Sequence, residues 1–495
     1  MSGLPSNIIV PMFAFDFDGS KAGGESAEFP VKLFVLGQRL STGLVPAETP
    51  HICYSASDAE AAFGHGSMLH RMSIYIFKNL SSVPCVFIAL DDEETGVAGT
   101  KTITVNCTGI ADDATGNGSL YAYIGGQRVV IPVSVGDIDD NIAISLGAAI
   151  TDQTNALSFT VTTVTANVIT LTARHKGLSA SDLDIRFNYN EGEIYPGGVT
   201  CVVADGVTGT VDPDVGDALE VIVDDWPIVM ANPYNDSSSM AKIEEYYLLQ
   251  SDILTRKEGI CYQAMRGSDT AALIAFATNS SRNSKYMVLE NANNRLQSTY
   301  EFAAASAAGK AQSIISDPAM PLKSIQLIGI NALERQHRLK ISERNTLAKS
   351  GIATCTDHAG VMSEATVTMY LKNAVGAADT TYQQQNKLFI LLAARNRLEN
   401  RFATRYPRAK LTDSIEGLRQ GQQVMTSDIG RSEALAWFNT CVYDGWFEGG
   451  QANFDQFNSQ LIVSRDSVNT NRLNFLLPPN LIDQFLLCTG TIQFI

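Results

Sequence analysis

Six histidines and eight cysteines are the residues of this chain best suited to metal or redox chemistry, and their spacing favours neither. The cysteines are widely separated and form no CxxC pair, which indicates reduced core thiols. His65 and His70 are five positions apart, which is not the i, i+4 spacing of a helical HExxH zinc site. The sequence therefore predicts no metal site and no cofactor.

Phosphate and nucleophile chemistry also lack their motifs. No GxGxxG or GxSxG occurs, and Gly309 and Lys310 have no glycine before them at P-loop spacing. Acidic clusters at residues 91–94 and 137–140 do not follow the calcium-loop pattern and are typical of solvated loops and helix starts. We expect a protein that is not an enzyme, with a nucleotide-dependent α/β enzyme as the alternative from another class.

One charged pattern is more informative. Arg397, Arg401 and Arg405 recur every four residues of a predicted helix, beside an apolar stripe that includes Leu398 and Phe402. The chain has a net charge of -16, so a cationic ridge invites an acidic partner; a solvated helix face is the alternative. The same net charge argues against a general binder of nucleic acid or of anionic membranes.

Both ends of the chain have the pattern of strand-forming arms. Residues 484–495 carry no charged side chain, and Thr491, Ile492, Gln493 and Phe494 alternate polar with apolar. Near the amino end the corresponding apolar residues are Ile8, Ile9, Val10, Phe13, Phe15 and Phe17. Each arm either packs on its own domain or adds a strand to a sheet in another subunit, and two such ends favour exchange between subunits.

The elements between the arms predict an α/β protein, α+β overall, with several domains in 495 residues. A buried strand at 31–37, a helix over 57–80 and a strand at 83–90 form a parallel unit. The same pattern returns later: strands at 226–231 and 286–289, and helices at 237–250, 271–277 and 300–316. Residues 99–205, rich in Thr, Val and Gly, predict an inserted β-rich module.

The carboxy-terminal third begins with a predicted hairpin of strands at 351–356 and 361–370. Helices follow over 381–405 and 427–443, and a strand pair at 461–464 and 473–477 comes before the arm. Within the module, strands are expected at 101–107, 120–124, 128–133, 158–164 and 168–173, with a helix at 138–150. Neither a signal peptide nor a long uncharged apolar run is evident, so we expect a protein made and kept in a cytoplasm.

Several blocks, in order along the chain, resemble the tail sheath proteins of Mu-like contractile-tailed phages. They are AAFGHGSML (61–69), RGSDTAA (266–272), SDPAMPLKSIQL (316–327), ERNTLAKSGIAT (343–354), FATRYPRAKL (402–411), and NFDQFNSQLIVSRD continuing to NRLNFLLPPNLIDQF (453–485). The inserted segment 99–205 matches least clearly, apart from YIGGQRVVIPV (123–133).

The resemblance implies a multi-domain sheath subunit with an α/β core, an inserted outer β-rich domain and terminal arms. The α/β core would comprise 30–98 and 206–330, the inserted domain 99–205, the conserved carboxy-terminal sheath core 331–483, and the arms 1–29 and 484–495. A further alternative for this module is that it binds a glycan or decorates the particle, which Tyr121 and Tyr123 permit.

The implied function is a structural one, in which copies polymerise helically around a tail tube and contract to drive it through the host envelope during genome delivery. The implied partners are further copies of the chain, the tail tube protein, and tail terminator and baseplate proteins, without nucleic acid or direct membrane insertion. The expected place is the virion tail, assembled in the host cytoplasm. A sheath of a related contractile injection or secretion system is the alternative.

The resemblance also suggests roles for particular residues. Residues 491–494 and 8–17 would be donated strands, and Arg397, Arg401 and Arg405 would contact an acidic tube. The predicted acceptor sheet comprises Leu461, Ile462, Val463, Leu473, Phe475 and Leu476.

Overall fold

The computed structural model describes residues 29–152, 156–279 and 283–494. These residues form two compact units, and the division falls inside helix α9 (Gln385–Arg405). The first unit, here called the main body, contains residues 30–390 together with the carboxy-terminal residues from Gln484 onward. The second, here called the hairpin unit, contains residues 391–483. Residues 331–390, which the sequence grouped with the carboxy-terminal core, thus lie in the main body.

An eight-stranded sheet forms the centre of the main body. Its order is β15 (Met362–Ala365), β14 (Ile352–Thr356), β13 (Met287–Asn291), β12 (Ile260–Met265), β11 (Val229–Ala231), β1 (Leu33–Gln38), β3 (Cys85–Leu90) and β2 (His51–Cys53). The strands from β14 to β3 are parallel, whereas β2 and β15 are antiparallel edge strands. The parallel strands β1, β3 and β12 are mostly apolar and fully buried because helices cover the sheet, which confirms the α/β prediction.

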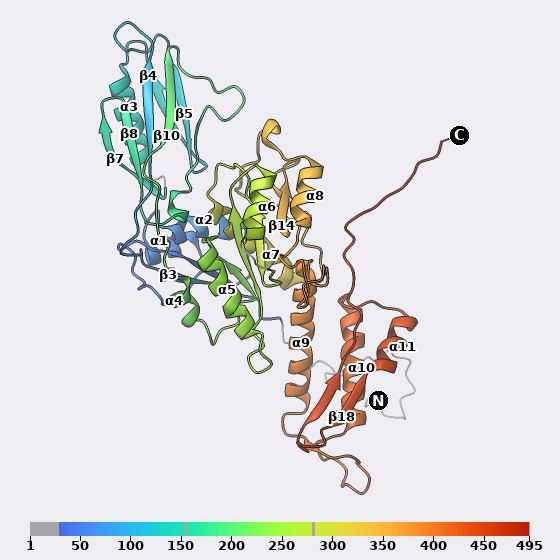
Figure 1. The fold of residues 1–495 in the computed structure, drawn as a ribbon. Helices are drawn as coiled ribbons and strands as arrows, with labels where there is room; N and C mark the ends of the chain where they lie inside the picture. Colours follow the sequence, from blue (N-terminus) through green and yellow to red (C-terminus); the bar gives the residue numbers. More distant parts are fainter. Residues whose placement is uncertain (1–28, 153–155, 280–282, 495) are drawn as a thin grey trace, which may run out of the picture. The chain divides into compact units, whose positions relative to one another are not determined.

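Helices complete the main body (Figure 1). They are α1 (Ala56–Phe63), α2 (Met68–Asn79), α4 (Val215–Glu220), α5 (Ser237–Gln250), α6 (Thr270–Asn279), α7 (Thr299–Ser316) and α8 (Ile341–Lys349), with 3-10 turns η2 (Ser179–Ser181) and η3 (Arg335–His337). Helices α2 and α7 pack on each other and on β1. Between them Arg71 and Glu301 form an ion pair of 2.6 Å, and each side chain is 1% exposed.

The single helix predicted over 57–80 is wrong. The chain forms α1 and α2 instead, because Gly64 and Gly66 adopt φ values of 94° and 76° that a continuing helix excludes. Helix α1 is capped by Ser55, whose side chain accepts the hydrogen bond from the Asp58 amide.

The β-rich module has two antiparallel sheets around one core. The sheets are β10 (Val199–Asp205), β4 (Thr100–Cys107), β8 (Val168–Ala173), β7 (Phe159–Thr165), and β6 (Gln127–Val133), β5 (Gly118–Ile124), β9 (Ile185–Phe187). Helix α3 (Asp139–Thr151) packs on both sheets, with Leu146 fully buried beside Ile103 and Leu120. The five predicted strands are present, while β9 and β10 were missed.

The hairpin unit is smaller and mostly helical. It contains residues 391–405 of α9, β16 (Lys410–Leu411), β17 (Val424–Met425), α10 (Ser427–Tyr443), α11 (Gln451–Gln460), β18 (Ile462–Arg465) and β19 (Leu473–Leu476). Phe438 and Phe457 stack with ring centroids 4.2 Å apart, and Trp437 meets the Phe447 ring edge-on at 5.1 Å. Trp437 Nε1 also donates to the Ala394 carbonyl at 2.9 Å, which ties α10 to α9.

Among the helices that the structure describes, none combines the length and the apolar character needed to cross a membrane.

Candidate assembly surfaces

The predicted acceptor strands form the hairpin β18–β19. The two strands pair antiparallel, with Ile462 opposite Leu476 and Val463 opposite Phe475. They form a separate two-stranded sheet, so within the described residues each strand has one edge without a strand partner. Leu461 is an exception to the prediction: it is the C-cap of α11, and its side chain is 3% exposed.

The turn between these strands is held by one carboxylate. Asp466 accepts from the amides of Val468 and Asn469, at 2.9 and 2.7 Å, and from the Asn474 side chain at 2.9 Å. These bonds, the Asn474 bond foremost, hold the pKa of Asp466 well below its usual value. The turn therefore sets the strand register by local chemistry.

The two faces of the hairpin differ. On the inner face Val463, Leu473 and Phe475 pack over Gly430 of α10, and Phe475 meets the Phe402 ring edge-on at 5.3 Å. On the outer face Ile462 and Leu476 are 56% and 57% exposed. The hairpin therefore presents both open backbone edges and exposed apolar side chains.

The three arginines of the predicted ridge lie in ion pairs inside the hairpin unit. Arg401 Nε donates to Glu433 at 2.5 Å, and Arg405 lies 3.5 Å from the same carboxylate. Arg397 pairs with Asp444 at 2.7 Å and stacks over the Trp446 ring. The ridge is thus not a free cationic surface, and a tube contact stays a prediction.

Glu433 is the centre of that network. Burial raises its pKa, but hydrogen bonds from Tyr406, at 2.7 Å, and from Arg401 outweigh burial and hold the pKa below its usual value. The carboxylate therefore stays ionised at neutral pH and joins α10 to the end of α9. Sequence reasoning missed Glu433 because it lies on α10, whereas the arginines that it binds lie on α9.

The carboxy-terminal arm has two parts, here called the arm root (residues 484–487) and the arm tip (residues 488–494). The root is bound to the main body: Gln484 Nε2 donates to the Ala319 carbonyl at 2.9 Å, and Lys323 Nζ donates to the Phe485 carbonyl at 2.5 Å. Lys323 also lies over the Phe485 ring. Nothing in the sequence spacing indicated this anchor.

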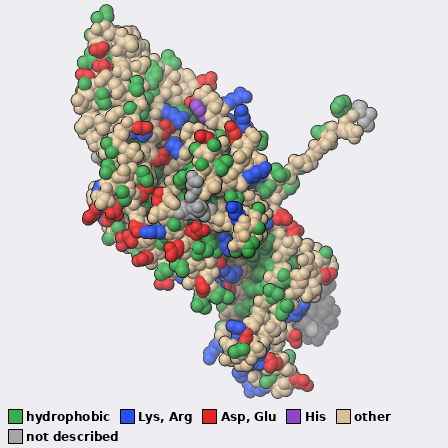
Figure 2. Space-filling view, viewed as in Figure 1, with side chains coloured by type: hydrophobic (Ala, Val, Ile, Leu, Met, Phe, Trp, Pro, Cys, Tyr) green, Lys and Arg blue, Asp and Glu red, His purple; other side chains and the backbone are tan. Residues whose placement is uncertain are grey.

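No hydrogen bond of this kind joins the arm tip to residues 29–152, 156–279 or 283–487. Ile492 and Phe494 are 94% and 93% exposed, and no strand forms at Thr491 or Gln493. Figure 2 shows this tail as a projection without charged side chains. Its pairing with a sheet stays a prediction, and the amino-terminal residues Ile8, Ile9, Val10, Phe13, Phe15 and Phe17 lie outside the described residues.

The position where an open α/β sheet commonly binds ligands is covered. That position is the carboxyl edge between β1 and β11, where the strand order reverses. There the buried Gln38 donates to Asp92 Oδ1 and to the Lys176 carbonyl, both at 2.8 Å. Lys176 lies in the loop after β8, so a loop of the module contacts the carboxyl end of β1.

One histidine cluster was also missed, because α1 and α2 bend back on each other at Gly64. His65 Nδ1 lies 2.7 Å from Glu60, and the rings of His65 and His70 are 5.5 Å apart. However, the Gly66 amide donates to His70 Nδ1 at 3.1 Å, which places the proton of the neutral ring on Nε2, facing Glu60. A metal ion binds a ring nitrogen only when that nitrogen carries no proton. The geometry therefore disfavours metal binding at His70 Nε2.

Comparison with known proteins gives one full-length relative. The chain is 32% identical over 497 residues to the tail sheath protein of the Mu-like prophage FluMu of Haemophilus influenzae, covering 100% of this chain and 99% of the relative. No family model matches the chain.

Solved structures of sheath proteins are also similar. A sheath tail protein from Listeria innocua, 10% identical, has a TM-score of 0.51 and covers 93% of this chain and 94% of its own length. Another from Desulfitobacterium hafniense, 11% identical, has a TM-score of 0.48 over 96% and 100% of the two chains. At such identities the Listeria likeness concerns the fold alone.

Proposed function

Because this chain belongs to the tail sheath proteins of Mu-like phages, we propose a route by which its copies join and move. The protein is a structural subunit of a contractile phage tail sheath, and thus a component of the virion tail. Copies polymerise helically around the tail tube, and contraction drives the tube through the host envelope. The full-length identity to a prophage protein favours a phage tail over a secretion-system sheath.

The joint between copies is strand addition. The arm tip of one copy, residues 491–494, pairs with an open edge of the β18–β19 hairpin of another copy. The observation that carries this proposal is the full exposure of Ile492 and Phe494 on an uncharged tail. Burying two such side chains contributes about 1.5–3 kcal/mol each, in addition to the backbone hydrogen bonds. Residues 8–17 act as a second donated strand.

The outer face of the hairpin suits this role. Ile462 and Leu476 are exposed on it, and the unpaired edges of a two-stranded sheet supply the backbone donors and acceptors. A strand bound in this way is a flexible connection, so that subunits rotate as rigid bodies without separating.

Contraction needs no fuel-binding site in this proposal. The extended lattice is metastable, and new contacts between copies release free energy as the sheath shortens. A bias of a few kcal/mol per subunit, the scale of ordinary conformational preferences, adds up over a cooperative assembly.

The remaining partners follow from the same function. The tail tube protein lies inside the sheath, and terminator and baseplate proteins meet its two ends. Arg405, 44% exposed beside Glu433, is the ridge residue most accessible to an acidic tube. Assembly takes place in the host cytoplasm, without nucleic acid or membrane insertion, and the net charge of -16 supports this. We propose a structural role without catalysis. Saturable binding of a nucleotide would favour the alternative, a nucleotide-dependent enzyme.

Electron microscopy of the purified chain tests the joint. The full chain should form long hollow striated tubes, whereas a chain ending at Leu487 should stay folded and form none. The matched pair Ile492→Asp/Phe494→Asp and Cys488→Asp/Thr489→Asp separates strand pairing from added charge: only the first should lose the tubes. Circular dichroism should show both variants folded. Tubes that persist without residues 488–495 would refute the strand donation.

A further inference from the structure

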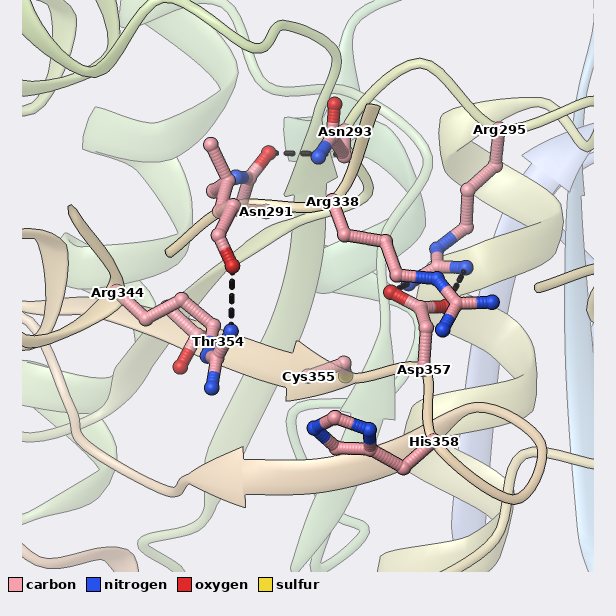
Figure 3. A pocket seen from close by; sticks show the side chains of 10 residues that line it. Asn291, Asn293, Arg295, Arg338, Arg344, Thr354, Cys355, Asp357 and His358 are labelled. Atoms are coloured by element: carbon pink, nitrogen blue, oxygen red, sulfur yellow. Dashed lines mark hydrogen bonds and ion pairs between the residues drawn. The ribbon is translucent and has the colours of Figure 1, made fainter. Parts of the chain in front are cut away.

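A small cavity lies at the carboxyl ends of two neighbouring parallel strands of the main body. Its volume is about 90 Å³, and Asn291 at the end of β13 and Asp357 just after β14 both line it. Figure 3 shows Arg295, Arg338 and Arg344 around the same space. Three guanidinium groups therefore share a cavity that has one carboxylate in its wall.

Two of these arginines are neutralised by acidic partners. Arg295, 2% exposed, forms a two-pronged pair with Asp357 at 2.6 and 3.1 Å. Arg344 forms a similar pair with Glu364, at 2.5 and 3.1 Å. These two ion pairs balance the charges of Arg295 and Arg344, so the positive charge of Arg338 has no acidic partner in the cavity wall.

The uncommitted donors belong to Arg338 and Arg295. Arg338 Nε donates to the Leu333 carbonyl at 2.8 Å, and its terminal NH groups have no acceptor in the part of the chain described here. Arg295 Nε is buried and likewise has no hydrogen-bond partner among the described residues. A buried donor without a partner is destabilising, so such a group indicates a missing acceptor.

We propose that this cavity binds a small inorganic oxyanion of the phosphate or sulfate class. Such an ion is an acceptor on every side, and it fits a cavity with room for a few water molecules. Arg338 supplies the two terminal NH groups, Arg295 the buried Nε–H, and the Asn291 amide a further donor. The bound ion ties the segment around Arg338 to the ends of β13 and β14. This site is independent of the proposed strand exchange.

Calorimetric titration of the full chain with inorganic phosphate, at fixed pH and ionic strength, tests the site. One saturable site is expected, with a dissociation constant on the order of 1 mM, as suits a few charge-assisted hydrogen bonds in a partly solvated cavity. Arg338→Gln should weaken binding about tenfold or more. Arg335→Gln, at an exposed arginine of the same segment, is the matched control and should bind as the unchanged chain does.

The thermal unfolding temperature provides a second measurement of phosphate binding. Phosphate should raise it for the unchanged chain and for Arg335→Gln, and less for Arg338→Gln, while sodium chloride of equal ionic strength should not. Circular dichroism checks that Arg338→Gln is folded. Absence of saturable heat would mean that the cavity holds water only, and would overturn the proposal. Equal binding by Arg338→Gln would do the same.

Discussion

The edge strands of the eight-stranded sheet are covered or short, whereas the β18–β19 hairpin has open edges among the described residues. At one edge of the large sheet, the backbone of residues 324–327 bonds to β15 and to the residue before it. The Ser363 amide donates to the Ile325 carbonyl at 2.9 Å, and the Leu327 amide donates to the Val361 carbonyl at 2.8 Å. The other edge ends in β2, which has three residues. The hairpin, by contrast, is a sheet of two strands with exposed apolar side chains.

This difference determines whether a sheet can pair with a further strand. Covered or very short edge strands prevent a sheet from pairing with other chains. A two-stranded hairpin is marginal until a third strand or a packed face supports it. Here α10 supports the inner face, and among the described residues the outer edges have no strand partner, as the proposed acceptor role requires. The three predictions below test this contrast, beginning with the largest expected effect.

Removal of the charge from Glu301 should damage the main body severely. Glu301→Gln leaves the buried Arg71 guanidinium without its counter-charge, and a broken buried pair lowers the free energy of unfolding by about 3–5 kcal/mol. Denaturant unfolding measures the loss. Hydrogen exchange should rise in α2 and α7, while α10 keeps its protection.

The control for this variant is an exposed pair. Asp205, 82% exposed, pairs with Lys101, and Asp205→Asn should change the free energy of unfolding by less than about 1 kcal/mol. A loss of equal size in both variants would mean that burial does not set the strength of the pair.

Displacement of the hairpin should have a smaller effect on stability but a clear effect on assembly. A Cβ at Gly430 would lie 2.8 Å from Leu473 Cδ2 and 3.1 Å from Val463 Cγ1, so Gly430→Val forces the hairpin off α10. Overpacking of this kind lowers the free energy of unfolding by about 1–3 kcal/mol. Tube formation, scored by electron microscopy, should decline as well.

Ser432→Val on the exposed side of α10 is the matched control, because it brings the same β-branched residue into the same helix. It should keep the tubes. If Gly430→Val assembled normally, the hairpin would not be the acceptor.

Acid should weaken the hairpin unit through Glu433. Its folded-state pKa is lowered, so its contribution to stability is present above the usual glutamate value of 4.5 and is lost as the pH falls through the folded-state pKa. Glu433→Gln should therefore be less stable than the unchanged chain at neutral pH, and the difference should close in acid. Denaturant midpoints of both proteins across that range measure it. A difference that did not vary with pH would contradict the assignment.

Local patterns predicted the parts of the fold that depend on local chemistry. The buried strands β1 and β3 are uninterrupted apolar runs, and α10 has Thr426 as a cap whose side chain accepts from the Ile429 amide at 3.2 Å. The strand pair of the hairpin was predicted from its two short apolar segments, and the structure adds the turn that Asp466 closes.

Contacts between distant segments were not predictable in the same way. Strand β12 was missed because the polar Gln263 interrupts a short apolar run, although the sheet buries every residue of it. The arginine ridge was placed on the right helix, but its partner Glu433 lies on another helix. Helical periodicity shows which side chains share a face and not what covers that face.

The anchored root of the arm decides where a mechanical load would travel. The chain leaves the main body along α9, forms the hairpin unit, and binds the main body again at Gln484 and Lys323. Tension on the arm tip would thus pass through these contacts into the body that holds the eight-stranded sheet. In the proposed joint, tension on a copy's own arm enters at the arm root, whereas tension on a neighbour's arm enters at the hairpin unit. The contacts of Gln484 and Lys323 together therefore attach the arm to the main body.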